Sequence, residues 1–227
     1  MNLSSLGPVL VIAAHADDEV LGCGGTMARL AGAGCKVHTV FMTDGVSARE
    51  GADDGEARRQ AACLAANKMG SQEPTFHDFP DNAMDTVPLI DIARAVESAV
   101  ARVSPATILT HHHGDLNVDH EIVHRAVMTA CRPQPGSLVR TIMTFSVRSS
   151  TEWAIAKHGN TFVPNFFVDV TETLETKLEV LRAYEMEMRA FPHSRSIEAV
   201  EHEARLLGAS CGVPAAEALV MVRSIMA

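Results

Sequence analysis

The sequence predicts an α/β protein in which a mainly parallel sheet is covered by helices on both faces. Short apolar runs alternate with helical patterns over residues 8–131, and each helical pattern separates two apolar runs, as crossover connections between parallel strands require. Hydrophobic residues make up 47% of the 227 residues, which is enough for a sizeable core. The length favours a single domain over residues 1–227.

The first part of the chain contains four apolar runs, each followed by a helical pattern. The runs are short, and the helical patterns stop at residues that break helices, such as Gly34, Gly70 and Pro105. In chain order, we expect a strand over 8–14, a helix over 24–33, a strand over 36–42, a helix over 54–69, a strand over 75–79, a helix over 88–103, a strand over 106–110 and a helix over 119–131.

The last third of the chain is less regular. Thr171 opens a periodic run and is a suitable N-cap residue, which predicts a helix from there through Tyr184. We further expect strands over 139–147 and 165–170, a helix over 196–207, and a final element over 219–225 whose pattern fits a strand or a helix. Breaks rich in Gly and Pro at 133–136 and 212–214 are typical of loops.

Charge and composition exclude several classes of function. The formal net charge is −9, which argues against binding to nucleic acid or to an anionic membrane surface. No apolar run approaches the roughly 18 residues of a membrane span, and residues 1–8 lack the features of a secretory signal. The five cysteines include no C-x-x-C pair. A disulfide framework is therefore not expected, and a reducing cytoplasm fits best.

Four of the predicted strands end in polar clusters. These clusters are His15-Ala-Asp-Asp-Glu19, Thr43-Asp44, the pairs His77-Asp78 and Asp81-Asn82, and His111-His-His-Gly-Asp-Leu-Asn-Val-Asp-His120. In open parallel sheets, ligands bind outside the carboxyl ends of the strands. We therefore expect the four clusters to face one crevice.

The first and fourth clusters together predict a metal site. Three adjacent acids at 17–19 repel one another unless a positive charge lies between them; a helix N-terminus would also accommodate them, but it would not explain His15. His120 begins a predicted helix opposite this cluster, whereas a solvated loop is expected for 111–113. Two imidazoles and the Asp18 carboxylate, with one open position, are typical of catalytic zinc and also suit ferrous iron. Asp119 is a candidate for orienting its neighbours.

Two other patterns compete with this interpretation. His120-Glu-Ile-Val-His124 matches H-E-x-x-H, in which Glu121 would be the base of a zinc peptidase. The extended metzincin form fails at Val127 and Ala130. Glycines at 22, 24 and 25 imitate a dinucleotide fingerprint, but Ala28 replaces its final glycine and the turn is too long. We expect these glycines to allow close packing.

The motifs resemble those of a known enzyme family. Ala14-His-Ala-Asp-Asp-Glu19, with Gly22 and Gly25 after it, resembles the A-H-P-D-D-E motif of the PIG-L/LmbE-type N-deacetylases. Asn117-Val-Asp-His120 resembles the second motif of that family, usually H-P-D-H. The similarity continues through residues 115–117, 149–153, 164–165, 184, 192–196 and 216–218, and so covers essentially the whole chain.

The resemblance implies a Rossmann-like domain that holds one zinc ion and removes acetyl from N-acetylated amino sugars. By position, His15, Asp18 and His120 match the metal ligands and Asp17 matches the general base. Two residues depart from the motifs. Ala16 replaces a proline, and Asn117 replaces a histidine that helps to stabilise the oxyanion; the loss of one such donor costs about 10²-fold in rate if nothing replaces it. His112, His113 and His193 are candidate replacements.

Substrate contacts are expected mainly from the resemblance. Arg58 and Asp81 match positions near the sugar, and His193 and Arg195 lie in the tail motif. Arg148 and Arg195 could hold a carrier phosphate, and Trp153 could stack on a sugar ring, although a lone Trp is more often part of the core. The expected partner is a small amino-sugar substrate, and homo-oligomers are compatible with the sequence. The alternatives are a zinc peptidase and a carbohydrate-binding relic without activity.

Overall fold

The computed structural model describes residues 3–45, 55–156 and 159–225. Its strands are β1 (Val9–Ala13), β2 (Val37–Thr43), β3 (Thr75–Phe79), β4 (Thr107–His111), β5 (Thr141–Phe145), β6 (Phe166–Asp169) and β7 (Ala216–Ser224). Its α-helices are α1 (Asp18–Gly32), α2 (Gly55–Lys68), α3 (Leu89–Val103), α4 (Val118–Ala130), α5 (Leu174–Leu181) and α6 (Ile197–Cys211). Short 3-10 turns cover η1 (Leu3–Leu6), η2 (Met84–Thr86), η3 (Thr151–Trp153) and η4 (Arg182–Tyr184).

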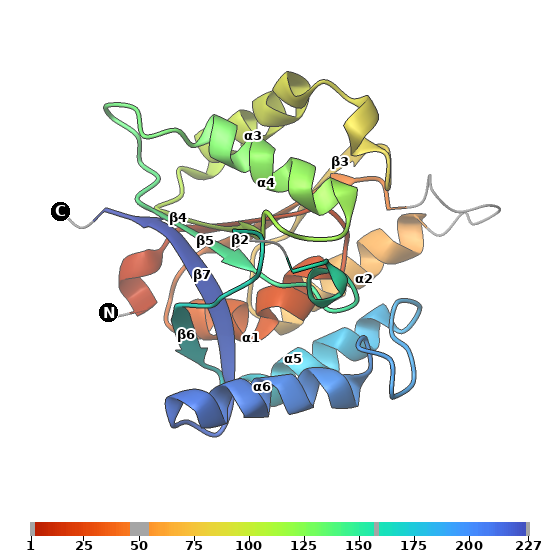
Figure 1. Cartoon of the computed structure of the whole chain (residues 1–227). Helices are drawn as coiled ribbons and strands as arrows, with labels where there is room; N and C mark the ends of the chain where they lie inside the picture. The colour runs from red at the N-terminus through yellow and green to blue at the C-terminus, as the bar shows by residue number, and fades with distance from the viewer. Residues whose placement is uncertain (1–2, 46–54, 157–158, 226–227) are drawn as a thin grey trace.

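The strands form one mixed sheet in the order β3-β2-β1-β4-β5-β7-β6 (Figure 1). The pairs from β3 to β5 are parallel, whereas β7 runs antiparallel to both β5 and β6. This arrangement confirms the predicted α/β fold with a mainly parallel sheet. The chain order reverses between β1 and β4, and ligands bind at the carboxyl ends of strands at such a switch point.

Helices cover both faces of the sheet, as predicted. Val9 and Val11 of β1 pack on the side of α1 and α2, while Leu10 and Ile12 of the same strand pack on the side of α3 and α4. The helices α5 and α6 lie beyond α1 on the first side (Figure 1). Because β1 is covered on both faces, all five of its residues are buried and it reads as a continuous apolar run.

The C-terminal part differs from the prediction at the boundaries of two elements. Of the two forms that the pattern fitted, the final element is the strand β7; it starts at Ala216, lies between β5 and β6, and has its first four residues buried. The helix expected from Thr171 starts later, at Leu174, and gives way to a 3-10 turn after Leu181. The Thr171 hydroxyl donates to the Asp169 carboxylate at 2.6 Å and does not cap the helix. A hydroxyl that bonds to a side chain two residues earlier is not available to cap the N-terminus of α5.

The first helix also differs, because α1 begins at Asp18 and not at residue 24. It is broken at Cys23, whose φ of −151° and ψ of 24° are not helical. A buried ion pair fills the break: Lys177 Nζ donates to the Leu21 carbonyl at 2.9 Å and lies 2.6 Å from Glu217 Oε1. Glu217 in turn accepts from the backbone N–H groups of Gly25 and Thr26, at 2.9 and 2.7 Å. Side chains from α5 and β7 therefore hold the two halves of α1.

The glycines at 22, 24 and 25 in α1 pack closely, as expected. A Cβ on Gly22 would lie only 2.3 Å from the Phe145 ring of β5, which is far inside van der Waals contact. Close approach of the helix to the sheet explains this glycine without a dinucleotide ligand. No helix among the described residues is long and apolar enough to cross a membrane.

Candidate metal centre

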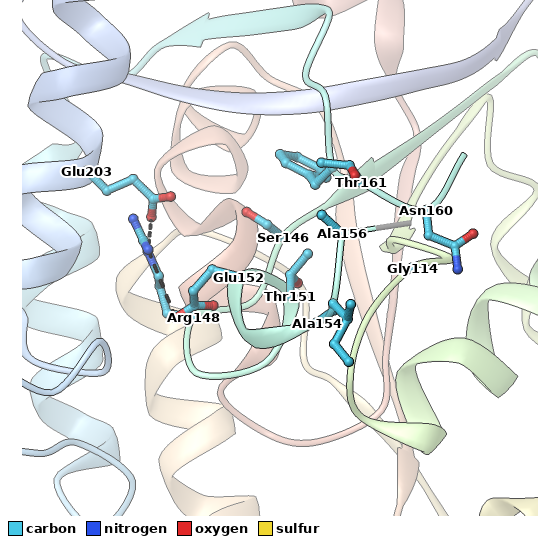
Figure 2. Close-up of a pocket in the computed structure, with 12 residues that line it drawn as sticks. Gly114, Ser146, Arg148, Thr151, Glu152, Ala154, Ala156, Asn160, Thr161 and Glu203 are labelled. Carbon is cyan, nitrogen blue, oxygen red and sulfur yellow. Dashed lines mark hydrogen bonds and ion pairs between the residues drawn. The ribbon is translucent and has the colours of Figure 1, made fainter. Parts of the chain in front are cut away.

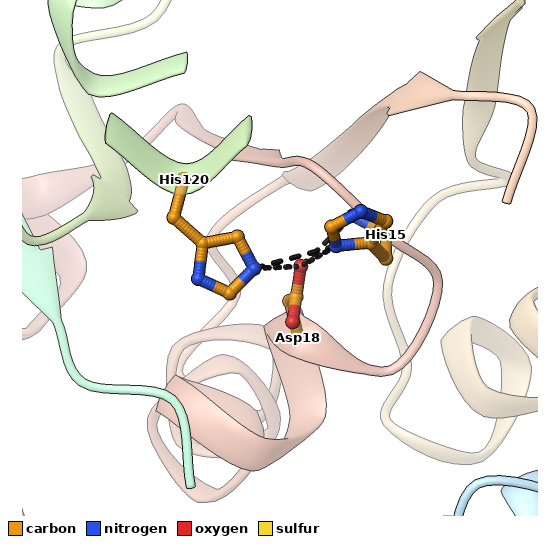
Figure 3. Close-up of side chains that lie close together, drawn as sticks. All are labelled: His15, Asp18 and His120. Carbon is orange, nitrogen blue, oxygen red and sulfur yellow. Dashed lines mark hydrogen bonds and ion pairs between the residues drawn. The ribbon is translucent and has the colours of Figure 1, made fainter. Parts of the chain in front are cut away.

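Three side chains from two distant segments meet at the switch point between β1 and β4. His15 follows β1, Asp18 is the first residue of α1, and His120 lies in the first turn of α4 (Figure 3). Asp18 Oδ2 lies 3.1 Å from His15 Nδ1 and 3.2 Å from His120 Nε2, and the two ring nitrogens are 3.3 Å apart. The structure thus brings together the three residues that the sequence predicted as ligands.

The outer nitrogen of each imidazole faces a carboxylate. His15 Nε2 lies 3.1 Å from Asp119 Oδ2 and 3.0 Å from Asp81 Oδ1. His120 Nδ1 lies 3.2 Å from Asp115 Oδ1. When these outer nitrogens carry the protons, the inner nitrogens turn their lone pairs toward Asp18. Carboxylates commonly orient metal-binding histidines in this way.

The pKa values of the three clustered side chains show that the site stabilises positive charge on its imidazoles. Burial lowers the pKa of His15, but Asp119, Asp18 and Asp81 outweigh this effect and raise the pKa well above its ordinary value. Burial opposes the charged form of His120 too, yet chiefly Asp18 raises its pKa to about 9. Burial favours the neutral form of Asp18, but His120 and His15 hold its pKa well below the ordinary range. A divalent cation can replace such protons.

The cluster fits a divalent metal on two observations. Two imidazole nitrogens and one carboxylate oxygen lie within 4.8 Å of one another, a donor set that suits zinc or ferrous iron with a position left for water. Asp18 Oδ1 is buried and has no hydrogen-bond partner among the described residues. A buried carboxylate oxygen without a partner is costly, and a cation would satisfy it.

Asp17 is held beside this cluster in a strained backbone conformation. Its φ of 131° lies in a region that residues other than glycine rarely adopt. Its backbone N–H donates to Glu19 Oε2 at 3.0 Å, and Tyr184 donates to the other oxygen of Glu19 at 2.7 Å. Arg195 Nη1 lies 2.7 Å from Asp17 Oδ2. Burial raises the pKa of Asp17 to about 6, although Arg195 opposes this rise.

This strain predicts an unusual effect of glycine on stability. Asp17→Gly is expected to have a larger free energy of unfolding than Asp17→Ala, by about 1–3 kcal/mol, because glycine relieves the positive φ. Both variants lose the carboxylate, so the difference between them isolates the backbone. Urea unfolding of the two variants measures it. Equal stabilities would show that the φ of residue 17 carries no strain.

A small polar cavity opens beside the cluster. Its lining comprises His15, Asp17, Arg58, Asp81, Asn82, Asn117, Glu187 and Arg195. The expected substrate residues Arg58, Asp81 and Arg195 therefore lie in one place. Both arginines are held by carboxylates, since Arg58 pairs with Glu187 and Arg195 pairs with Asp17. Arg195 Nη1 also lies 3.8 Å from Glu187 Oε2.

Asn117 caps α4 and faces the cavity. Its Oδ1 accepts from the Asp119 backbone N–H at 2.8 Å, and its Nδ2 donates to Asn82 Oδ1 at 3.0 Å. The capping bond fixes the amide orientation. The cavity lining therefore includes one neutral donor where the family motif usually has histidine.

The candidate replacements for that histidine lie elsewhere. His112 Nε2 lies 3.1 Å from the Asn160 carbonyl oxygen, and His113 Nε2 lies 2.6 Å from the carbonyl oxygen of Gly159. His193 Nδ1 accepts from the Arg195 backbone N–H at 3.0 Å. Among the described residues that line the cavity, none is one of these three histidines.

The prediction of a solvated loop at 111–113 is wrong for its first two residues. His111 ends β4 and is fully buried, and His112 is also buried. His111 Nε2 accepts from the Ala14 backbone N–H at 2.8 Å and so joins the ends of β1 and β4. The sheet extends one residue further than its apolar run, and this bond gives one nitrogen of the buried His111 ring a partner.

The H-E-x-x-H pattern is not assembled as a metal site in the described part of the chain. His124 Nδ1 lies 2.9 Å from the carbonyl oxygen of His111, and the clustered ligand sets include His120 but not His124. Glu121 is exposed. His124 instead makes the hydrogen bond expected of a structural histidine.

Three residues of the site had no predicted role, and one polar cluster was only partly placed. Asp115 lies 3.2 Å from His120 and is itself bonded by the hydroxyls of Ser150 and Thr151. Glu187 and Asn82 complete the cavity. Asp115 and Asn82 belong to the polar clusters expected at the crevice, whereas nothing in the sequence marks Glu187. The third cluster divides, because Asp78 pairs with Arg59 on the surface while Asp81 reaches the site.

Comparisons with known proteins identify a family and several relatives. The family model PIG-L, described as GlcNAc-PI de-N-acetylase, matches residues 10–131. YaiS of Escherichia coli K12, named as an uncharacterized deacetylase, is 30% identical over 78% of this chain and 89% of its own length. The diacetylchitobiose deacetylase of Thermococcus kodakarensis is 24% identical over 78% of this chain and 68% of its own.

Solved structures share the fold. The conserved protein TT1542 of Thermus thermophilus matches with a TM-score of 0.76 and 23% identity, over 96% of both chains. GalB of Pseudomonas putida, a 4-carboxy-2-hydroxymuconate hydratase, matches with a TM-score of 0.73 and 22% identity, over 96% of this chain and 97% of its own. A hydratase with the same fold shows that the fold alone does not determine the reaction.

Proposed function

This chain belongs to the PIG-L family, and from that membership we propose that it is a metal-dependent hydrolase that removes acetyl from an N-acetylated amino sugar. The observation that carries the proposal is the convergence of His15, Asp18 and His120, with Asp17 beside them. The deacetylases among the relatives support the reaction class. Zinc is the proposed metal, and ferrous iron also suits the donor set.

His15, Asp18 and His120 would hold the metal. When bound, it would supply a Lewis acid that polarises the acetamide carbonyl and makes a water more acidic. Asp119 and Asp115 lie against the outer nitrogens of the two imidazoles, so they favour protons on those nitrogens. The inner nitrogens would give up their protons when the metal binds, and one tautomer of each ring would then hold it.

Asp17 is the proposed general base. Its Oδ2 is held by Arg195, so Oδ1 accepts the proton of the attacking water. Arg195 also favours the ionised form of Asp17, and burial opposes it, so the carboxylate is ready both to take the proton and to return it. Return of that proton to the departing amine completes the hydrolysis, because an amide anion is a poor leaving group.

Asn117 is the proposed donor for the oxyanion. Its Nδ2 lies on the cavity wall and is held toward Asn82 by the capping bond. A neutral amide stabilises developing negative charge less than a cation does. In this proposal, Arg58, Asp81, His193 and Arg195 lie around the bound sugar, and His193 acts from the rim.

The proposed partner is a small amino sugar, and the proposed location is the cytoplasm. All five cysteines are free, which suits a reducing compartment. Residues 1–227 form a single domain in this proposal, because β6 and β7 complete the sheet that β1 to β5 begin.

Metal removal tests the proposed function. We expect the purified protein to release acetate from N-acetylglucosamine or one of its glycosides, to lose this activity with a chelator, and to regain it with zinc. Acetate assay and metal analysis measure these changes. Cleavage of casein would instead indicate a peptidase, and sugar binding without acetate release under any metal would indicate a relic.

A further inference from the structure

The only tryptophan of the chain stands at the surface near the candidate site. Trp153 ends the short turn η3 and is 51% exposed, so it lies outside the core, where a lone tryptophan is more often found. Its ring meets the His193 ring at a centroid distance of 5.6 Å and an interplanar angle of 78°. The exposed part of the Trp153 ring contributes no hydrophobic stabilisation to the fold. A flat ligand that covered this surface would gain free energy of binding from its burial.

Hydrogen bonds tie this aromatic pair to the candidate base. The Arg195 backbone N–H donates to His193 Nδ1 at 3.0 Å, and the Arg195 guanidinium reaches Asp17 Oδ2 at 2.7 Å. The same guanidinium donates to Ser149 Oγ at 2.6 Å, in the segment that leads to Trp153. Arg195 therefore links both sides of the aromatic pair to the cavity wall.

The segment on the Trp153 side is also fixed to the candidate metal ligands. Ser150 and Thr151 donate to Asp115, which contacts His120. Trp153 follows two residues after Thr151. The backbone segments that carry the aromatic pair are therefore connected by hydrogen bonds to the candidate base on one side and to a candidate ligand on the other.

The arginines of this region do not offer a free charge to a phosphate. Arg58 and Arg195 in the cavity pair with Glu187 and Asp17. Arg148, in the larger neighbouring cavity behind the turn, pairs with Glu203 at 2.7 Å and lies 4.0 Å from Glu152 (Figure 2). Of the three arginines that line these two cavities, each is held by a carboxylate. The surroundings therefore suit an uncharged ligand.

We propose that Trp153 and His193 form a platform for a second, uncharged sugar ring, joined through a glycosidic bond to the N-acetylated ring beside Asp17. The apolar C–H face of a pyranose suits an indole ring, while its hydroxyl groups can bond to the polar rim. This inference rests on the proposed function and narrows its substrate to a neutral disaccharide or longer glycan. A carrier phosphate, expected from Arg148 and Arg195 in the sequence, is not part of it.

Tryptophan emission tests the platform directly, because Trp153 is the only tryptophan. Zinc-loaded Asp17→Asn protein, which is expected to bind without turnover, is titrated with N,N′-diacetylchitobiose and with N-acetylglucosamine. We expect a saturable change in emission with the disaccharide, and half-saturation with the monosaccharide at a concentration at least about tenfold higher, equivalent to 1.4 kcal/mol. Equal responses, or no response to the disaccharide, would overturn the platform.

Kinetics give a second readout on protein that still turns over. Trp153→Ala is expected to raise KM for N,N′-diacetylchitobiose about tenfold and to change kcat by less than about twofold, with Trp153→Phe restoring most of the loss. The matched control is Phe167→Ala, which removes an exposed ring on β6 and should leave both constants unchanged. A loss of kcat at constant KM would overturn the platform.

The two proposals fail in different ways. If no sugar releases acetate but the disaccharide still changes the emission, the proposed function fails and the platform stands. If acetate is released equally well from mono- and disaccharide and the emission is unchanged, the reaction stands and the platform fails. An emission change that follows protein concentration and not sugar would show that a second copy of the chain covers Trp153, which also overturns the proposal.

Discussion

Asp17→Asn is expected to lower turnover by about 10²–10⁴-fold while the protein keeps its metal. Asparagine can still accept the hydrogen bond from Arg195 through its side-chain oxygen, so the local geometry should persist. It cannot take a proton from the attacking water at neutral pH. Acetate release at saturating substrate measures the loss, and metal analysis of the same preparation shows that His15, Asp18 and His120 remain a site.

The control for this prediction is Glu121→Gln. Glu121 is exposed on α4, although the H-E-x-x-H pattern would make it the base. We expect its turnover to stay within about twofold of the unmodified protein, as for a surface substitution. Near-normal turnover in Asp17→Asn would remove Asp17 from the role of base, and a large loss in Glu121→Gln would restore the peptidase hypothesis.

Lys177→Met is expected to reduce the free energy of unfolding by about 3–5 kcal/mol, because it leaves a buried carboxylate without its cation. The side chains of Lys177 and Glu217 are only 5% and 4% exposed. Glu217 would keep its two backbone donors in α1, but the charge would have no counterion. Chemical denaturation followed by circular dichroism measures the change.

A second substitution distinguishes loss of charge balance from loss of packing. Combining Lys177→Met with Glu217→Gln removes the remaining buried charge and keeps an oxygen for one of the two N–H groups of α1, so part of the lost stability should return. Arg205→Met is the matched control, because Arg205 pairs with Glu201 on the exposed face of α6; its cost should stay below about 1 kcal/mol. Equal costs for Lys177→Met and Arg205→Met would show that the buried pair adds no more than a surface pair.

Local sequence patterns predicted most of the strands and helices. Four short apolar runs became β1 to β4, and glycine or proline ended the intervening helices near the expected residues. These features depend on contacts between near neighbours in the chain, which periodicity and turn residues report directly. The start of α1 was wrong because side chains from α5 and β7 stabilise its break at Cys23.

The proposed metal ligands were also predictable, because they lie in two short motifs at the ends of strands. Adjacent acids after β1 and a histidine at the start of α4 cannot all be explained by local structure. The parallel sheet pairs β1 with β4, so the segments that follow these strands lie side by side. Asp18 Oδ2 and His120 Nε2 come from these segments and lie 3.2 Å apart.

The sequence by itself predicted the fold class and the candidate metal ligands, because local patterns and strand ends mark them, and the family resemblance offered the candidate base. Only the tertiary structure decided the partners of these groups. Segments that are distant in the chain place Glu187 beside Arg58 and Asp115 beside His120. The exposure of Trp153 likewise depends on how distant segments pack. The physical reason is that a particular charge pair, or the exposure of one particular ring, depends on which residues of other elements lie beside it, and such single contacts leave no periodic pattern in any one segment.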